Sequence, residues 1–130
     1  MKVKPEYFRV SEFACPCCRR VTVARGLIVA LEFFRRAWAA PVLVNSGYRC
    51  IPHNLEVGGA KGSRHLIGCA ADIRPVDPTL ITPFQNLASA LFGKLEGWEL
   101  KLYTTFVHVA VPREEAARLW NDDKIEILAR

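Results

Sequence analysis

Apolar residues recur at helical spacing along residues 26–39. This period of about 3.6 residues predicts an amphipathic helix with one apolar face. Pro41 ends the pattern, because proline lacks an N–H and its ring clashes with a helical backbone. A second helix is expected over residues 82–95, since Thr82 is a suitable N-cap and Pro83 suits the first helical position.

Short β-branched or alternating runs predict the strands, which are separated by proline, glycine and other turn residues. The predicted strands are residues 42–44, 70–73, 99–102, 106–111 and 125–128. The third and fourth of these are close enough in sequence to form a hairpin. Short helical segments are expected at residues 11–13, 53–57 and 113–120. Helices packed on a mostly antiparallel sheet define an α+β class, and we expect one domain spanning residues 1–130.

Two histidines and an aspartate form the first candidate site. His65 precedes Asp72 by seven positions across a glycine turn, so a loop imidazole and a strand carboxylate can converge on one point. His108 lies in a predicted strand, on the same face as Phe106 and Ala110. Two imidazoles and one carboxylate leave a tetrahedral zinc ion with one open position, as in catalytic sites. Spacing alone leaves open a simpler interpretation, in which the histidines are hydrogen-bonded core residues.

Several blocks of sequence surround these three residues. The central one is S-x-H-x-x-G-x-A-x-D, from Ser63 to Asp72, and the opening S-E-F-A-C lies at residues 11–15. The others are S-G-Y-R at 46–49, H-N at 53–54, V-G-G-A at 57–60 and F-V-H-V at 106–109. Together they resemble the zinc D,D-peptidase family, which includes D-Ala-D-Ala carboxypeptidases and phage L-alanyl-D-glutamate endolysins. The resemblance covers roughly residues 8–111 and is strongest to the short, single-domain branch.

The resemblance implies a fold of the hedgehog/D-Ala-D-Ala peptidase type and a set of roles for individual residues. His65, Asp72 and His108 would bind Zn²⁺. Arg49 would hold the carboxylate of a peptidoglycan stem peptide, because a planar guanidinium grips a carboxylate through two hydrogen bonds; a surface ion pair is the simpler alternative. Ser63 would lie in the cleft as a hydrogen-bond donor to substrate or to a ligand.

The implied activity is zinc-assisted hydrolysis of an amide bond in peptidoglycan stem peptides, of the D,D-carboxypeptidase or endopeptidase type. Family members usually carry the general base three or two residues before the last ligand, or two residues after it. In this chain those positions hold Thr105, Phe106 and Ala110, none of which transfers a proton. Glu99 is the tentative catalytic base, since a hairpin would fold its strand beside His108. The alternatives are Glu96, Glu114 and Glu115.

The missing base leaves two further hypotheses open. In one, the domain keeps its zinc but is catalytically weak or inactive, and binds wall peptides or a partner protein. In the other, the fold has a purely structural role in a phage particle and holds no metal. The small size and the lack of an obvious wall-binding module favour a phage or prophage origin.

The charge distribution adds little to this picture. The chain has 18 basic and 13 acidic side chains, a net charge of +5, but the basic residues are scattered. We therefore expect a solvated surface, a monomer and no nucleic-acid partner. No apolar run is long enough to span a membrane or to serve as a signal peptide. The expected location is the cytoplasm as made, with action on the cell wall after lysis or another route of export.

Cysteines form a second cluster in the sequence. Of the five cysteines, Cys15 and Cys18 have the C-x-x-C spacing of a zinc knuckle, with Cys17 between them. A structural zinc site needs four ligands, and Cys50 and Cys69 are distant in sequence. We therefore expect reduced thiols rather than a second metal site. A disulfide of Cys15 or Cys18 is the alternative for an exported protein.

Overall fold

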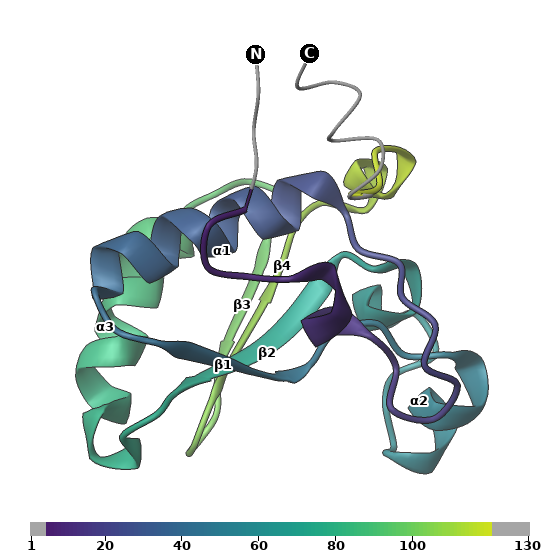
Figure 1. The fold of residues 1–130 in the computed structure, drawn as a ribbon, viewed down its shortest axis with the longest axis horizontal. Helices are drawn as coiled ribbons and strands as arrows, with labels where there is room; N and C mark the ends of the chain where they lie inside the picture. The colour runs from purple at the N-terminus through teal and green to yellow at the C-terminus, as the bar shows by residue number, and fades with distance from the viewer. Residues whose placement is uncertain (1–4, 121–130) are drawn as a thin grey trace.

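The computed structural model describes residues 5–120 of the 130-residue chain (Figure 1). The strands in this part are β1 (Val42–Ser46), β2 (Ala70–Pro75), β3 (Glu99–Leu102) and β4 (Val107–Ala110). The α-helices are α1 (Arg25–Trp38), α2 (Ile51–Glu56) and α3 (Ile81–Phe92). Short 3-10 helices are η1 (Val10–Phe13), η2 (Arg64–Ile67), η3 (Pro78–Leu80) and η4 (Arg113–Ala117).

The four strands form one sheet in the order β1-β2-β4-β3, and every neighbouring pair is antiparallel. The predicted α+β class and the predicted hairpin of the last two strands are therefore confirmed. The register aligns one row of residues across the sheet: Ser46 pairs with Asp72, Asp72 with His108, and His108 with Lys101. Residues directly opposite each other share a face of the sheet, so this row collects four polar side chains on one side.

The two faces of the sheet differ in their surroundings. Side chains alternate along a strand, so Ala71 and Ile73 point away from the face that carries Asp72. They join the apolar core with Val107 and Val109 of β4. Helices α1 and α3 cover this face, contributing mainly Leu27, Ile28, Leu31, Phe34, Phe84, Ala88 and Phe92 to the core. In Figure 1, α1 crosses the sheet, while α3 and α2 lie at opposite ends of it.

The structure corrects the predicted start of the second long helix. Thr82 is not its N-cap: α3 begins at Ile81, directly after η3, and Pro83 is its third residue. A proline is tolerated there because the first N–H groups of a helix have no partner within it. Asp77 supplies the cap upstream, where its side chain accepts a hydrogen bond from the amide of Thr79 at 3.0 Å. The helix ends at Phe92, before the predicted residue 95.

The other elements lie near their predicted places. Helix α1 agrees with the predicted range to within one residue at each end, and β1 and β2 run two residues further than predicted. The predicted helix at residues 113–120 is the shorter 3-10 helix η4. The strand predicted at 125–128 lies outside the described residues. Among those residues no helix is long and apolar enough to cross a membrane.

Candidate metal centre

The structure brings together the two histidines and the aspartate of the central motif. Asp72 and His108 are direct partners on β2 and β4, and His65 reaches them from η2. Each offers one atom to a group whose members all lie within 4.8 Å of one another. All three side chains are buried. Asp72 Oδ1 lies 3.3 Å from His65 Nε2 and 3.0 Å from His108 Nδ1.

His65 carries the strongest indication that a cation belongs among these atoms. Its Nδ1 lies 2.7 Å from the carbonyl oxygen of Gly47, which only accepts hydrogen bonds, so Nδ1 carries the proton. Nε2 then has a lone pair, is buried, and has no hydrogen-bond partner. That lone pair faces the carboxylate of Asp72, a repulsive arrangement that a cation between the two atoms would relieve.

The spacing of the donor atoms also suits zinc. Two nitrogen or oxygen ligands at about 2.0–2.1 Å from a tetrahedral zinc ion lie roughly 3.3 Å apart. The separations of 3.3 and 3.0 Å around Asp72 Oδ1 are close to this value. The donor set fits a zinc ion with one position left open.

Glu99 contacts the third ligand from its other side. Its Oε1 lies 3.0 Å from His108 Nε2, while its Oε2 lies 3.6 Å from Nε of Arg64. A carboxylate behind a ligating histidine fixes the orientation of the ring and increases its basicity. Burial alone would lower the pKa of His108, but its hydrogen bonds to Asp72 and Glu99 raise the pKa above its ordinary value.

The two carboxylates of the centre are both held in the ionised form. Burial would raise the pKa of Asp72, but its hydrogen bond to His108 and the charge of that ring bring it well below its usual range. Burial likewise opposes ionisation of Glu99, and its hydrogen bond to His108, with the charge of Arg64, lowers its pKa overall. At neutral pH both carboxylates therefore carry a negative charge.

Arg49 is fixed beside the centre by three separate contacts. Its Nη2 lies 3.2 Å from Asp72 Oδ2, so the two oxygens of that carboxylate face different partners. Its Nε donates to Ser46 Oγ at 3.1 Å, and its Nη1 donates to Asn54 Oδ1 at 3.2 Å. The side chain retains 15% exposure. Arg49 is thus an oriented, half-buried cation at the edge of the centre rather than a surface ion pair.

Ser63 and Asn54 fix the backbone around the centre. Ser63 is the N-cap of η2, where its Oγ accepts a hydrogen bond from the amide of His65 at 3.2 Å. Its own hydroxyl hydrogen remains available as a donor, the role expected from the sequence. Asn54 is buried and donates to the carbonyl of Ala60 at 2.9 Å, which ties down the glycine-rich loop.

A pocket of about 350 Å³ opens over these residues. The expected site residues Arg49, Ser63, His65, Asp72, Glu99 and His108 all line it. Among the described residues of its lining, Asp72 and Glu99 are the acidic ones. The alternative bases Glu96, Glu114 and Glu115 do not line it. The structure therefore favours Glu99 over the other carboxylates considered from the sequence.

Some residues of the site were not found from the sequence. Arg64 donates to the carbonyls of Gly97 and Val111 at 2.7 and 3.2 Å, and so joins η2 to the loop before β3 and to the end of β4. The position of Arg64 inside the central motif, next to His65, could have indicated that it belongs to the site. Lys101 and Tyr103 also line the pocket, and only the strand register could have placed them there.

Comparisons with known proteins agree with this arrangement. The sequence model of a family described as Peptidase M15 matches residues 6–110 of the chain. A zinc D-Ala-D-Ala carboxypeptidase from Streptomyces albus G is 52% identical over 33 residues, which make up 25% of this chain and 13% of that protein. The chain therefore shares a short segment with a much longer relative. No solved structure matches the chain significantly.

Proposed function

The chain belongs to the peptidase M15 family, which confirms the resemblance to zinc D,D-peptidases, and we propose that it hydrolyses an amide bond in peptidoglycan stem peptides. The observation that carries this proposal is the buried, unpartnered lone pair of His65 Nε2 facing Asp72 across a pocket. Such an arrangement is explained by a bound cation and has no evident purpose without one.

The proposed metal ligands are His65 through Nε2, Asp72 through Oδ1 and His108 through Nδ1. Zinc bound there would supply Lewis acidity to a scissile carbonyl and lower the pKa of water toward about 7. The protein's own contribution is to fix the ligands. Gly47 holds the ring of His65, and Glu99 holds the ring of His108.

Glu99 is the proposed proton carrier. Its carboxylate is ionised and lines the pocket. Its side chain is 31% exposed, so a proton from a water molecule in the pocket can reach it. A general base in this position would take a proton from the attacking water and return it to the leaving amine. Because Glu99 also holds His108, its effect on proton transfer must be separated from its effect on metal binding.

The charge around the pocket supports an anionic substrate. Arg49, Arg64 and Lys101 line it, and Arg49 is already oriented by Ser46 and Asn54. A preoriented guanidinium loses little side-chain entropy when it binds a carboxylate. We propose that Arg49 binds a carboxylate of the stem peptide. The name of the Streptomyces relative, a carboxypeptidase acting on D-Ala-D-Ala, agrees with a substrate of this class.

One observation favours the alternative of a zinc-binding protein with weak catalysis. Ala110, at one of the positions where the resemblance implies a general base, is fully buried and carries no proton-transferring group. In that case the pocket would bind wall peptides without cleaving them, and the substrate contacts of Arg49 would be retained.

The test is incubation of the zinc-loaded protein with purified peptidoglycan, followed by quantification of new amine termini. We expect release by the wild-type protein and none by His65→Ala, which should also lose the zinc of this centre because two ligands hold the metal poorly. His53→Ala is the matched control: it changes the remaining histidine, on α2 outside the pocket lining, and should keep both zinc and activity. No release at high enzyme concentration would favour the binding role.

A further inference from the structure

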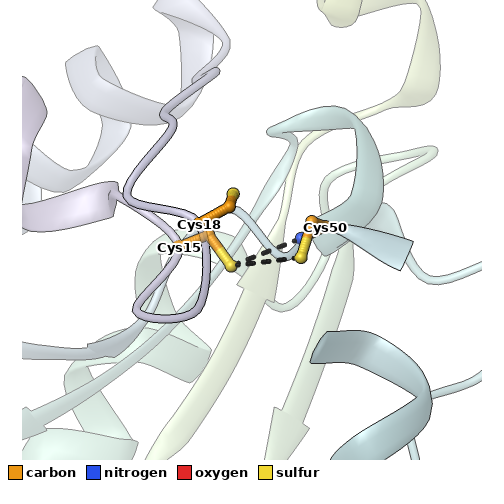
Figure 2. Close-up of side chains that lie close together, drawn as sticks. All are labelled: Cys15, Cys18 and Cys50. Carbon is orange, nitrogen blue, oxygen red and sulfur yellow. Dashed lines mark hydrogen bonds between the residues drawn. The ribbon is translucent and has the colours of Figure 1, made fainter. Parts of the chain in front are cut away.

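Three cysteines, two of them far from the third in the sequence, lie together next to the S-G-Y-R loop. Cys15 and Cys18 come from the loop after η1, and Cys50 directly precedes α2 (Figure 2). Cys15 Sγ and Cys50 Sγ lie 3.6 Å apart, and the three sulfurs lie within 4.8 Å of one another. No disulfide joins any of the five cysteines, and the grouping of three of them was not predicted from the sequence.

The loop that carries Cys15 and Cys18 is held in a tight turn by its own backbone. Arg19, directly after Cys18, adopts the left-handed conformation with φ of 62°, which side-chain-bearing residues rarely adopt. The turn is closed by two hydrogen bonds of 2.8 Å, from the amide of Arg19 to the carbonyl of Cys15 and from the amide of Cys15 to the carbonyl of Arg20. The amide of Cys50 also points at Cys15 Sγ, at 3.5 Å. The thiols are therefore positioned by backbone structure.

We propose that Cys15, Cys18 and Cys50 bind a second zinc ion, with Cys17 as the fourth ligand. Sulfurs bound to tetrahedral zinc at about 2.3 Å lie roughly 3.8 Å apart, close to the 3.6 Å between Cys15 and Cys50. Cys17 is exposed and lies in the same loop. With its thiol turned toward the other three, it would complete a four-sulfur set.

The protonation of the thiols is consistent with this site. Burial opposes the thiolate form of Cys15, but the amides of Cys50, Cys18 and Cys17 outweigh it and lower the pKa of Cys15 to about 6. The amide of His53 favours the thiolate of Cys50, but burial and the neighbouring thiols raise its pKa to about 11 overall. Those neighbours are Cys15, Cys17 and Cys18. The lowered pKa of Cys15 favours a thiolate ligand there, whereas a bound cation would be needed to ionise Cys50.

The position of this cluster gives it a structural role next to the metal centre. Cys50 follows Arg49, the proposed substrate-binding residue, and the amide of Tyr48 donates to the carbonyl of Phe13 at 2.8 Å. Gly47 packs so closely on Phe13 that a Cβ there would lie 2.6 Å from its Cα. A zinc ion bound to these cysteines would therefore stabilise the packing of the segment around Phe13 on the S-G-Y-R loop. That loop orients Arg49 and His65.

The test measures metal content and sulfur ligation in the full-length protein, and is independent of catalysis. We expect two zinc ions per wild-type chain and one in His65→Ala, whose remaining zinc should show sulfur neighbours at about 2.3 Å in X-ray absorption spectra. Cobalt substitution of His65→Ala should give the near-ultraviolet thiolate-to-cobalt charge-transfer absorption.

Variants of single cysteines identify the ligands. In the His65→Ala background, Cys50→Ser should remove the remaining zinc and Cys17→Ser should weaken its binding. Cys69→Ala is the matched control, because Cys69 is a buried cysteine of the apolar core and should leave the metal in place.

The proposal is overturned if His65→Ala binds no zinc, or if its bound zinc has only nitrogen and oxygen neighbours. It is equally overturned if non-reducing peptide mapping of freshly purified protein finds Cys15 and Cys50 joined in a disulfide. Zinc content, zinc ligation and disulfide mapping are all measured without a cysteine variant. They therefore test the proposal even if the cysteine variants do not fold.

Discussion

Glu99 and Ala110 are cross-strand partners on β3 and β4. The family resemblance implies that the position of Ala110 is one of three that can carry the general base, there as an aspartate, and in this chain a carboxylate stands opposite that position on the neighbouring strand. Both residues share the face of the sheet that carries His108. We interpret Glu99 as the replacement for the missing aspartate, reaching the same pocket from the adjacent strand.

Substitutions of Glu99 should separate its two effects. Glu99→Gln keeps an oxygen that accepts a hydrogen bond from His108 Nε2 but removes the charge behind the ring, so zinc affinity should fall by no more than about tenfold. It removes the proton acceptor, so kcat/KM should fall by about 100-fold or more. Glu99→Ala should lower both the zinc affinity and kcat/KM. Glu96→Gln, an exposed glutamate outside the pocket lining, should behave as wild type.

The same interpretation predicts a rescue. Adding Ala110→Asp to Glu99→Ala should recover at least about tenfold in kcat/KM, because a carboxylate is returned to the same face of the sheet. If Glu99→Gln instead hydrolyses at nearly the wild-type rate, Glu99 is a positioning residue only, and the proton carrier is a water network or another carboxylate.

The raised pKa of His108 predicts how zinc binding depends on pH. Zinc needs the neutral imidazole, and the hydrogen bonds to Asp72 and Glu99 outweigh burial and favour the protonated ring. Below this raised pKa zinc must displace a proton, so affinity should fall about tenfold for each pH unit as the pH decreases. Above it, the competition from the proton disappears and the affinity should level off.

A competition titration against a chromophoric chelator between about pH 5 and 8 measures this dependence. In Glu99→Gln the pH at which zinc affinity levels off should be lower, because one of the two carboxylates that favour protonation of His108 is gone. Zinc affinity that does not change between these pH values would show that zinc does not compete with a proton on His108. The same conclusion would follow if affinity levelled off at the same pH in Glu99→Gln as in the wild-type protein.

At the scale of elements, hydrophobic periodicity predicted the limits of the helix that packs on the core. It failed at the start of the helix whose first turn is determined by a side-chain cap. Helix α1 has a clear apolar face against the core, and its limits agree with the pattern. The start of α3 was wrong because Asp77 and η3 begin the turn earlier than Thr82. Such a cap depends on one side-chain hydrogen bond and leaves no periodic signal.

Gly68 joins η2 to β2, and therefore His65 to Asp72. It has φ of 75°, and an added Cβ would collide with the backbone carbonyl of Thr22. Gly58 has φ of 72° but open space around it, which makes it a matched control. Gly58→Ala should cost about 1 kcal/mol of unfolding free energy from the strained φ alone. Gly68→Ala should cost about 2 kcal/mol more, because an oversized group meets a rigid neighbour.

Denaturant unfolding of both variants, in the presence of chelator, checks this difference. Gly68→Ala should also bind zinc more weakly, since the collision displaces the segment between two ligands, while Gly58→Ala should not. Equal costs for the two substitutions would mean that the turn at Gly68 relaxes without disturbing the metal centre.

Over the whole molecule, the site combines segments that the sequence keeps apart. The ligand trio could be predicted because the S-x-H-x-x-G-x-A-x-D block and the later F-V-H-V block resemble a known family; spacing alone made a core histidine the more plausible interpretation. Glu99 could be proposed because a hairpin was expected. The contacts of Arg64 and Asn54, and the approach of Cys50 to Cys15, depend on how loops fold over the sheet, which no local pattern records.

The central claim is that His65, Asp72 and His108 hold a zinc ion. The most direct measurement is anomalous diffraction at the zinc absorption edge from crystals of the zinc-loaded full-length protein. The account predicts a peak about 2.0–2.1 Å from His65 Nε2, Asp72 Oδ1 and His108 Nδ1. Crystals with no anomalous peak among these three atoms would contradict it.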